Sequence, residues 1–276
     1  MSVPIWVNGE LHEPGKAVVS VFDHGLMVGD GVFETIKAVN GQSFALTRHL
    51  DRLALSAKRM DLPEPDLAAI ADGVRRCLEA APAWPLARIR ITYTSGPGPL
   101  GSDRGTAGTN TIIIVGEQAP FPATADVVVV PWPRNERGAL AGVKSTSYGD
   151  NAKALAYAKE RGGGEAIFEN LAGNLCEGTG SNIFIVTGGR LITPTLSSGC
   201  LAGVTRALTL EWCGGEEADV PISALYEAEE AFLTSTTRDV QPIRAVDGKV
   251  LPKAPGPVTL EAMKVFAERS AADLDP

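Results

Sequence analysis

The pattern of apolar and polar positions divides the chain into short strands and amphipathic helices. Residues 4–14, PIWVNGELHEP, predict two strands joined by a Gly-containing turn, and Asn40-Gly41 is the strongest hairpin signal in the chain. Residues 47–63 place apolar side chains at i, i+3, i+4 and i+7, which predicts a helix with one buried face. Thr47 is its expected N-cap, and Pro63 is its stop signal.

The same pattern predicts further elements up to the C-terminus. We expect helices near residues 66–80, 151–159, 203–212, 222–228 and 257–269, and strands at 87–94, 110–117 and 125–133, with several more between 165 and 194. The apolar run NTIIIVGE, residues 110–117, is typical of a buried strand. Residues 117–124 are rich in proline and form the best linker candidate. The expected class is α/β with mixed sheets and flanking helices, divided into a small domain, residues 1–116, and a larger one, residues 125–276.

Composition limits the classes of function. The 276 residues include 44% hydrophobic and 21% charged side chains, which is ordinary for a globular protein with a sizeable core. The net charge of −8 comes without a basic stripe, which argues against nucleic acid and anionic membranes as partners. No apolar run reaches the roughly 20 residues of a membrane span, and the N-terminus lacks a signal-peptide pattern, so we expect a cytoplasmic location. Four scattered cysteines form no metal-binding pattern, and no metal site is expected.

Lys144 and Tyr148 lie among small side chains in the segment GVKSTSYGDN, residues 142–151. Desolvation lowers the pKa of a lysine amine, and a neutral amine is the form that reacts to give a Schiff base. Tyr148, four residues later, is placed to hydrogen-bond an oxygen beside the imine. The alternative is a surface lysine with a tyrosine that only packs, and this segment alone leaves both open.

Two segments offer hydrogen-bond donors for an anion such as phosphate. Gly203 precedes a predicted helix whose first residues, Val204 and Thr205, present free backbone N–H groups, and the Thr205 hydroxyl adds a further donor. A second hydroxyl cluster, Ser235–Thr237, ends an apolar strand. Each segment by itself also fits a plain helix start or an ordinary turn.

Two charged residues require partners. Glu177 sits at the Gly-Thr-Gly turn of the stretch LCEGTGSNIFIV, ahead of an apolar run, and burying its charge requires a specific cation. Arg52, on the predicted amphipathic helix, either binds a phosphate or pairs with Asp51 or another acid. His24 and His49 have no partners at catalytic spacing and are expected to be structural.

Seven segments, taken in order, resemble the class IV aminotransferases, which are pyridoxal-phosphate enzymes of fold type IV. The family includes branched-chain aminotransferases, D-amino acid transaminases and aminodeoxychorismate lyases. The segments are FDHGLMVGDGVFETIK, RHLDRL, GVKSTSYGDN, EAIFENLAGNLCEGTGSNIFIV, LITP, GCLAGVTR and FLTSTTRDVQPI. Each is short, but their order across nearly the whole chain is specific. The resemblance implies a two-domain fold like that of D-amino acid aminotransferase, in which residues 125–276 bind pyridoxal 5'-phosphate.

The resemblance also assigns roles to individual residues. Lys144 corresponds to the catalytic lysine that forms the Schiff base with the cofactor and then shuttles the proton. Arg52 corresponds to the phosphate-binding arginine, and Tyr148 to a tyrosine that in branched-chain enzymes contacts O3′, the hydroxyl oxygen attached to the cofactor ring. Glu177 corresponds to the carboxylate that pairs with the pyridine nitrogen, where a buried negative charge favours the protonated ring. The remaining contacts assigned to the cofactor phosphate are the amides of Val204 and Thr205, and Thr236.

The substrate side of the site departs from the pattern of D-amino acid transaminases. Leu100 and Ser102 stand in the glycine-rich loop where those enzymes carry a carboxylate-binding Arg and His, and Phe33 stands where they have a tyrosine. Arg90 resembles a substrate-facing arginine of branched-chain enzymes, although an arginine that only points outward from its strand is the alternative. The candidate substrate-binding residues are Phe33, Arg90, its competitor Arg88, and Thr237.

We expect a transaminase that moves an amino group between a D-amino acid and a 2-oxo acid, with an unusual site for the substrate carboxylate. A 4-amino-4-deoxychorismate lyase, which eliminates pyruvate and gives 4-aminobenzoate, is the second hypothesis because GDGVF and SGPGPLGSDRG resemble that subgroup. A branched-chain L-amino acid aminotransferase is the third because GVFETIK differs from its FEGIR pattern. A non-catalytic homologue that binds pyridoxal phosphate is a remote fourth.

The resemblance also implies partners. Small amino acids and 2-oxo acids are the expected substrates, and family members are usually homodimers with shared active sites. The loop at residues 24–27 and the glycine-rich loop are the candidates to reach the partner subunit.

Overall fold

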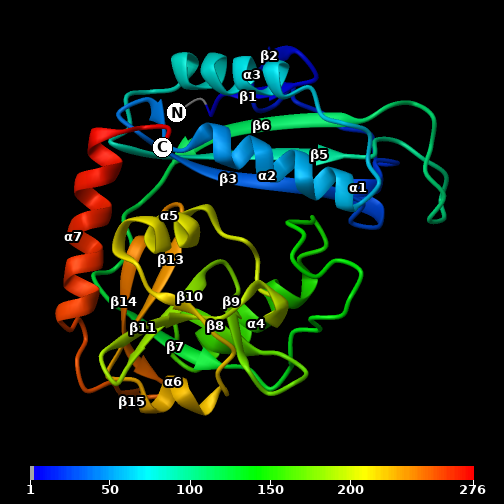
Figure 1. The fold of residues 1–276 in the computed structure, drawn as a ribbon. Coiled ribbons are helices and arrows are strands. Elements are labelled where there is room, and N and C mark those ends of the chain that lie inside the picture. Colours follow the sequence, from blue (N-terminus) through cyan, green and yellow to red (C-terminus); the bar gives the residue numbers. More distant parts are fainter. Residues whose placement is uncertain (1–2) are drawn as a thin grey trace. The chain divides into compact units, whose positions relative to one another are not determined.

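Residues 3–276 of the computed structural model form two α/β units (Figure 1). Unit 1 contains the chain up to Ala119, Val143–Tyr148 and Leu274–Pro276, and unit 2 contains Pro120–Gly142 and Gly149–Asp273. The segment Val143–Tyr148 therefore belongs to unit 1, although its neighbours in sequence belong to unit 2. A boundary between independent domains at residues 117–124 stays a prediction.

Unit 1 is built on a six-stranded antiparallel sheet of order β2-β1-β6-β5-β3-β4. Its elements are β1 (Ile5–Val7), β2 (Glu10–His12), α1 (His24–Met27), β3 (Gly31–Val39), β4 (Gln42–Ser43), α2 (Leu46–Arg59), α3 (Leu67–Ala80), β5 (Leu86–Thr94) and β6 (Asn110–Glu117). The first two strands are the hairpin predicted at residues 4–14. Asn40 and Gly41 both have positive φ and form the predicted turn between β3 and β4.

Helices α2 and α3 share one hydrophobic core with this sheet. Strand residues such as Ile89 and Ile113 are buried together with helix residues such as Leu53 and Ile70. The start of α3 follows its sequence signal, because the Asp66 side chain caps the first turn.

The predicted N-cap of α2 is wrong. The helix begins at Leu46, and Ala45 at the cap position has a left-handed backbone with φ of 54° and no side-chain cap. Thr47 lies inside the first turn and instead donates to the Asp275 carboxylate, through its amide at 2.9 Å and its hydroxyl at 2.5 Å. The carboxylate that satisfies this helix start therefore comes from the other end of the chain.

Two further expectations for unit 1 need correction. Residues 24–27 form the short helix α1 rather than a loop, because the Asp23 carboxylate caps it by accepting the Gly25 amide at 2.8 Å. Strand β6 is buried on one face only: Ile113 and Val115 are buried, whereas Ile114 between them is 36% exposed. In an antiparallel sheet with helices on one side, alternate residues point away from the core.

Unit 2 contains a nine-stranded mixed sheet of order β12-β11-β10-β13-β14-β7-β8-β9, with β15 paired to β14. Its strands are β7 (Ala125–Val129), β8 (Glu165–Glu169), β9 (Leu175–Gly178), β10 (Asn182–Thr187), β11 (Arg190–Thr193), β12 (Glu216–Glu217), β13 (Glu230–Ser235), β14 (Asp239–Val246) and β15 (Lys249–Val250). Its helices are α4 (Gly149–Glu160), α5 (Val204–Cys213), α6 (Ser223–Glu227) and α7 (Pro257–Ala272), with a short 3₁₀ turn at Leu196–Ser198. The predicted helices of this half are confirmed to within a few residues.

Parallel pairs near one edge of this sheet, together with the parallel pair β11–β12 at the other edge, give it its mixed character. β14, β7 and β8 are parallel neighbours, and α4 lies between β7 and β8 in the chain, as a parallel crossover requires. β8 pairs antiparallel with β9, which carries Glu177. The mixed α/β class expected from the sequence is confirmed. In the part of the chain that the structure describes, no helix has the length and apolar character needed to cross a bilayer.

Candidate functional site

Lys144 is fixed beside β3 by backbone hydrogen bonds. The amide of Phe33 donates to the carbonyl of Lys144 at 2.9 Å, and Val32 and Ser145 form an isolated β-bridge. The Lys144 amide lies 3.4 Å from Ser56 Oγ on α2. The short segment that carries Lys144 is therefore bound to the edge of β3. These contacts fix the backbone from which the lysine side chain extends.

Phe33, itself a predicted site residue, is the centre of a cluster that contains three others. The Lys144 Nζ lies 4.4 Å from the centroid of the Phe33 ring, and the Arg90 Cζ lies 3.4 Å from it. The Tyr148 ring packs against the same phenylalanine in an edge-on arrangement, with centroids 5.1 Å apart and an interplanar angle of 82°. The fold brings together a primary amine, a guanidinium and a phenol around one aromatic ring.

Strand register explains why Arg90 reaches this cluster. Phe33 stands opposite Thr92, and Thr35 stands opposite Arg90, so these side chains share the face of the sheet that points away from the core. The Arg90 Nε donates to Thr92 Oγ1 at 3.2 Å. Burial lowers the pKa of Arg90 to about 10, with the nearby Tyr148 acting in the opposite direction. Arg90 forms no ion pair with any carboxylate among residues 3–276.

Arg88 is placed less favourably. It lies two residues earlier on the same face of β5, opposite Lys37, and its side chain is exposed. Burial lowers its pKa as well, although no hydrogen bond or ring contact joins it to Phe33 or Lys144 in the described chain. Of the two competing arginines, Arg90 is the one that contacts the cluster.

On the covered face of the same sheet, Arg52 forms a buried ion pair. Its Nε and Nη2 donate to the Glu34 carboxylate at 2.8 and 2.7 Å, and His49 Nδ1 lies 2.7 Å from the same carboxylate. Burial alone would raise the pKa of Glu34, but the charge of Arg52 and the hydrogen bonds from Arg52 and His49 outweigh it and hold the pKa at about 2. Burial is also the main cause that lowers the pKa of His49.

The acid that pairs with Arg52 is therefore the buried Glu34 and not its exposed neighbour Asp51. A bidentate contact fixes the orientation of the guanidinium plane. The assignment of Arg52 to a phosphate stays a prediction. His49 completes the hydrogen bonding of Glu34, and its purely structural role stays a prediction.

In unit 2, Glu177 is held through both of its carboxylate oxygens. The Leu201 amide donates to Oε2 at 2.9 Å, and Arg134 Nη2 lies 3.4 Å from Oε1. The side chain is 13% exposed. The sequence indicated that a buried Glu177 requires a nearby cation. Arg134 is such a cation, and no sequence pattern had singled it out.

Helix α5 begins at Val204, three residues after Leu201. No side chain caps it, and its N-cap residue Gly203 packs so closely on Asn182 that a Cβ there would lie 1.9 Å from the amide oxygen. Only glycine fits at this N-cap position, and the backbone amides of Val204 and Thr205 lie in the first turn of a ten-residue helix that no side chain caps. A helix start of this kind favours an anion, and its assignment to the cofactor phosphate stays a prediction.

Thr236 and Thr237 lie in the tight turn between β13 and β14, where Ser235 pairs with Asp239. Both threonines are half-buried. Their assignment to the cofactor phosphate and to the substrate stays a prediction.

Sequence reasoning missed Glu34 as a partner of Arg52, and Arg134 as a partner of Glu177. Glu34 carried a signal, because it is a lone charge in the apolar strand VFETI, and His49 and Arg52 are spaced three apart on one helix face. Arg134 carried none, since it lies in a loop far from Glu177 in sequence.

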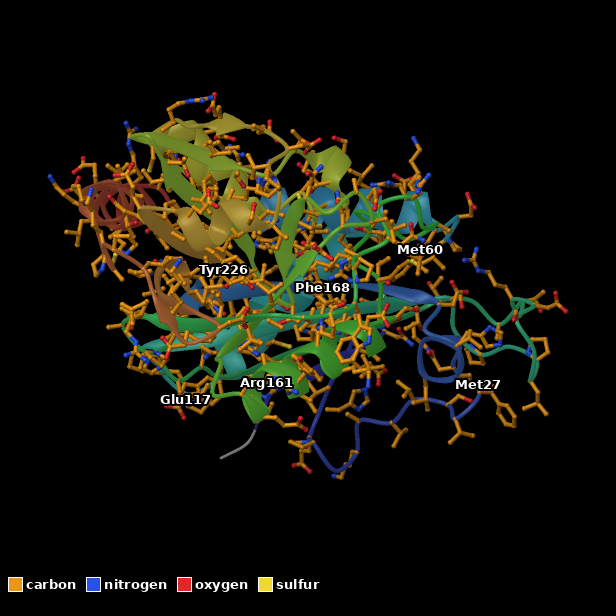
Figure 2. The ribbon with its side chains drawn as sticks, turned by 90° about the horizontal axis from the view of Figure 1, so that it is seen from below. Met27, Met60, Glu117, Arg161, Phe168 and Tyr226 are labelled. Carbon is orange, nitrogen blue, oxygen red and sulfur yellow. The ribbon has the colours of Figure 1, made fainter. Side chains whose placement is uncertain are left out.

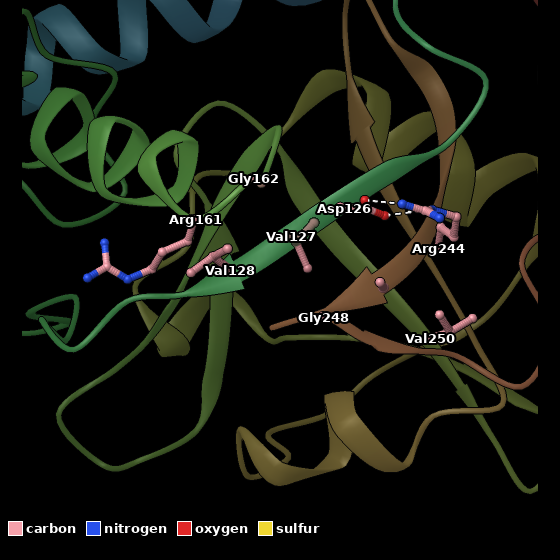
Figure 3. A pocket seen from close by; sticks show the side chains of 10 residues that line it. Asp126, Val127, Val128, Arg161, Gly162, Arg244, Gly248 and Val250 are labelled. Carbon is pink, nitrogen blue, oxygen red and sulfur yellow. Dashed lines mark hydrogen bonds and ion pairs between the residues drawn. The ribbon is translucent and has the colours of Figure 1, made fainter.

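A shallow hollow on unit 2 contains none of the predicted site residues (Figure 3). It is lined by residues of β7 and β14, by Gly162 and by Arg161. Its Arg244 donates to the Asp126 carboxylate at 2.9 Å, and the guanidinium of Arg161 lies 3.4 Å from the centre of the Tyr157 ring. Because no residue that the family resemblance assigns to the cofactor or the substrate lines this hollow, we do not place the active site there.

Comparisons with known proteins show the family of the chain. The family model for amino-transferase class IV matches residues 31–246. A protein of Methanocaldococcus jannaschii named as a branched-chain-amino-acid aminotransferase is 34% identical over 96% of this chain and 95% of its own length. A Mycobacterium tuberculosis protein named bifunctional aminodeoxychorismate lyase / D-amino acid transaminase is 28% identical over 96% of both chains.

Solved structures show the same fold. The branched-chain aminotransferase of Thermoproteus uzoniensis, crystallised with norvaline, superposes with a TM-score of 0.91 at 29% identity, over 97% of this chain and 94% of that one. The family model covers the segments that carry Phe33, Lys144 and Glu177. The chain therefore belongs to the class IV aminotransferases, the pyridoxal-phosphate-dependent transaminases of fold type IV.

Proposed function

We propose that this transaminase moves an amino group between a D-amino acid and a 2-oxo acid, with Lys144 as the catalytic residue and Arg90 as the anchor of the substrate carboxylate. The observation that carries the proposal is the cluster around Phe33, where the Lys144 amine and the Arg90 guanidinium lie 4.4 and 3.4 Å from one ring centroid. An amine for covalent chemistry and a cation for a carboxylate are the two groups that an amino-acid substrate requires.

The described residues fit pyridoxal 5'-phosphate, the cofactor of this class. The uncapped N-terminus of α5 offers the Val204 and Thr205 amides to a phosphate, and Gly203 is the residue type that close packing there demands. Glu177 supplies a carboxylate for the ring nitrogen, and Lys144 an amine for the aldehyde. Arg52, Tyr148 and Thr236 are the further cofactor contacts that we propose.

When bound, the cofactor acts as an electron sink for bond breaking at the substrate Cα. The protein's part is to move the proton. Lys144 is the group proposed to carry the proton between the substrate Cα and the cofactor carbon C4′. The Lys144 Nζ lies 4.4 Å from the centroid of the Phe33 ring, so the ring helps to position the group that moves the proton.

Arg90 is suited to hold a carboxylate because it is partly desolvated. Burial removes water that would otherwise compete for the guanidinium, as the lowered pKa of about 10 indicates. The Phe33 ring contacts one face of the Arg90 guanidinium, and the Thr92 hydroxyl accepts a hydrogen bond from its Nε. This anchor differs from the Arg and His of typical D-amino acid transaminases, whose loop positions hold Leu100 and Ser102, and Leu100 is 79% exposed.

Two other reactions have support. A lyase acting on 4-amino-4-deoxychorismate is favoured by the relative whose name joins that activity with D-amino acid transamination. A branched-chain L-amino acid aminotransferase is favoured by the 34% identical relative and by the position of Arg90. Both would use Lys144 in the same way, so the substrate distinguishes them.

A half-reaction screen tests the proposal. D-alanine, L-leucine and L-glutamate are each added to protein loaded with pyridoxal phosphate, while the visible absorption of the bound cofactor is followed and pyruvate release from aminodeoxychorismate is assayed in parallel. Loss of absorption with D-alanine but not with L-leucine supports our assignment. Reaction with L-leucine alone refutes it in favour of the branched-chain enzyme, and pyruvate release without amine transfer refutes it in favour of the lyase.

Lys144→Ala should abolish turnover, while Lys159→Ala, which alters an exposed lysine on α4, should leave it unchanged. A wild-type protein that takes up no pyridoxal phosphate would overturn the assigned site as a whole.

A further inference from the structure

Arg134 lies against Glu177 from the side of β8. Phe168 and Glu177 are directly opposite each other on the antiparallel pair β8 and β9, so their side chains share one face. The guanidinium carbon of Arg134 lies 4.2 Å from the centre of the Phe168 ring, which is buried in unit 2 (labelled in Figure 2), while Nη2 lies 3.4 Å from Glu177 Oε1. The arginine therefore stacks on one residue of the pair and attracts the other.

The backbone and the far edge of Arg134 are fixed as well. Its amide donates to the Glu169 carbonyl at 2.7 Å, and the residue forms a β-bridge with Asn170. Its Nη1 donates to Asn151 Oδ1 at 3.2 Å, and Asn151 Nδ2 donates to the Thr179 carbonyl at 2.7 Å. Thr179 belongs to the turn that follows Glu177, so these contacts fix both the arginine and the turn.

The guanidinium of Arg134 does not use all of its hydrogen-bond donors. Its Nε is buried and has no hydrogen-bond partner in the described structure. A buried donor without a partner is unfavourable for folding, and its presence in a native structure calls for a reason. The contact with Glu177 supplies one, because it is the only ion pair of Arg134 among the residues described.

The geometry points to Arg134 as a positioning residue for Glu177. The terminal torsion of a glutamate is broad and roughly two-fold, so a single contact leaves the plane of its carboxylate free to turn. Arg134 on Oε1 and the Leu201 amide on Oε2 together fix that plane. This inference rests on the proposed pairing of Glu177 with the cofactor ring nitrogen, and Arg134 itself need not touch the cofactor.

The test compares four variants loaded with ¹⁵N-labelled pyridoxal phosphate. Arg134→Met removes the charge and keeps much of the apolar stem, and Arg134→Lys keeps the charge without the planar fork. Arg137→Met is the matched control, since the side chain of Arg137 is 80% exposed and pairs only loosely with Glu136 at 3.9 Å. Glu177→Gln gives the reference signal for a ring nitrogen without its carboxylate.

The ¹⁵N chemical shift of the ring nitrogen is the first measurement, and kcat and KM with the best amino donor are the second. In Arg134→Met the ¹⁵N shift should move from the wild-type value towards that of Glu177→Gln. The value of kcat should fall about tenfold, which is at the lower end of the losses seen when a residue that orients a functional group is removed. KM and cofactor loading should stay within about twofold, because the phosphate and substrate contacts are elsewhere. Arg134→Lys should be intermediate, and Arg137→Met should equal wild type.

Four results would overturn the inference. The first is a wild-type shift in Arg134→Met, and the second is a loss of activity explained by lower cofactor loading with an unchanged shift in the loaded fraction. If Arg134→Met does not fold, an unchanged shift and kcat in Arg134→Lys would count equally against it, because the lysine cannot reproduce the fork. A wild-type shift already equal to that of Glu177→Gln would instead refute the role of Glu177, and this inference with it.

Discussion

The two faces of the unit 1 sheet differ in whether their charged side chains form ion pairs. On the face under α2 and α3, the fully buried Glu34 is neutralised by a bidentate Arg52 and by His49. On the other face, Arg90 is half-buried and Arg88 exposed, and neither forms an ion pair within the described chain. The same strands, β3 and β5, supply both sets because successive side chains point to opposite faces.

This difference separates charges that are paired within the core from a cation that has no acidic partner. A charge enclosed in the core must be fully paired or it destabilises the fold, so Glu34 and Arg52 have partners that hold each other. A cation without an acidic partner beside an amine remains available to a ligand, which is the situation of Arg90 near Lys144. The covered face explains stability, and the other face is where we place the substrate.

Removing Glu34 should have the largest effect. Glu34→Ala leaves the Arg52 guanidinium buried without its carboxylate, and we expect a loss of about 3–5 kcal/mol in the free energy of unfolding, measured by urea denaturation. The matched control is Glu79→Ala, which breaks an exposed pair with Arg75 and should cost less than about 1 kcal/mol. Equal losses of unfolding free energy in Glu34→Ala and Glu79→Ala would show that the buried ion pair contributes no more to stability than the exposed one.

Acid should weaken the covered face in two steps. Because the pKa of His49 is lowered from 6.5, the folded protein binds fewer protons than the unfolded chain below that pH, and stability falls as the pH drops. The pKa of Glu34 is lowered from 4.5 to about 2, so its contribution of about 3 kcal/mol is complete above pH 4.5 and is lost between pH 4.5 and 2.

Urea unfolding of the wild type and of Glu34→Gln between pH 7 and pH 3 measures these two steps. The variant should lack the second one, because glutamine does not titrate. If the unfolding free energy of the wild type falls with pH below 4.5 no more steeply than that of Glu34→Gln, Glu34 is not held ionised by its neighbours.

The substrate face should respond in activity rather than in stability. Arg90→Met should lower kcat/KM about 10–100-fold, the value of a hydrogen bond to a charged group, with cofactor loading unchanged. Arg88→Met, two residues away on the same face, should change kcat/KM less than about threefold. A larger loss in Arg88→Met than in Arg90→Met would reverse our choice between the two arginines.

The smallest effect is expected for the ring between the two cations. Phe33→Leu keeps the apolar volume but removes the π face that contacts Arg90 and Lys144, a contact typically worth about 0.5–1 kcal/mol. We expect kcat/KM to fall about two- to fivefold, measured with the donor that reacts best in the half-reaction screen. A hundredfold loss would mean that Phe33 contacts the substrate directly and does more than support the cations.

Local signals predicted the elements whose determinants lie inside them. The start of α3 was readable because Asp66 caps its own helix, and the β3–β4 turn because Asn40-Gly41 favours the required positive φ. The start of α2 was misjudged because its capping carboxylate belongs to Asp275 at the other end of the chain. One-sided burial of β6 was also misjudged, since apolar content alone does not reveal which face a helix covers.

The sequence by itself determined the family, through seven short segments in a fixed order, and with it the α/β fold and the cofactor. It also singled out Lys144 and Glu177, because an amine among small residues and a carboxylate at a glycine turn both call for a chemical reason. Only the tertiary structure decided the partners: Glu34 for Arg52, Arg134 for Glu177, and Arg90 rather than Arg88 beside Lys144. Such pairings join residues far apart in the chain, and strand register and loop path, which no local pattern encodes, bring their atoms within reach.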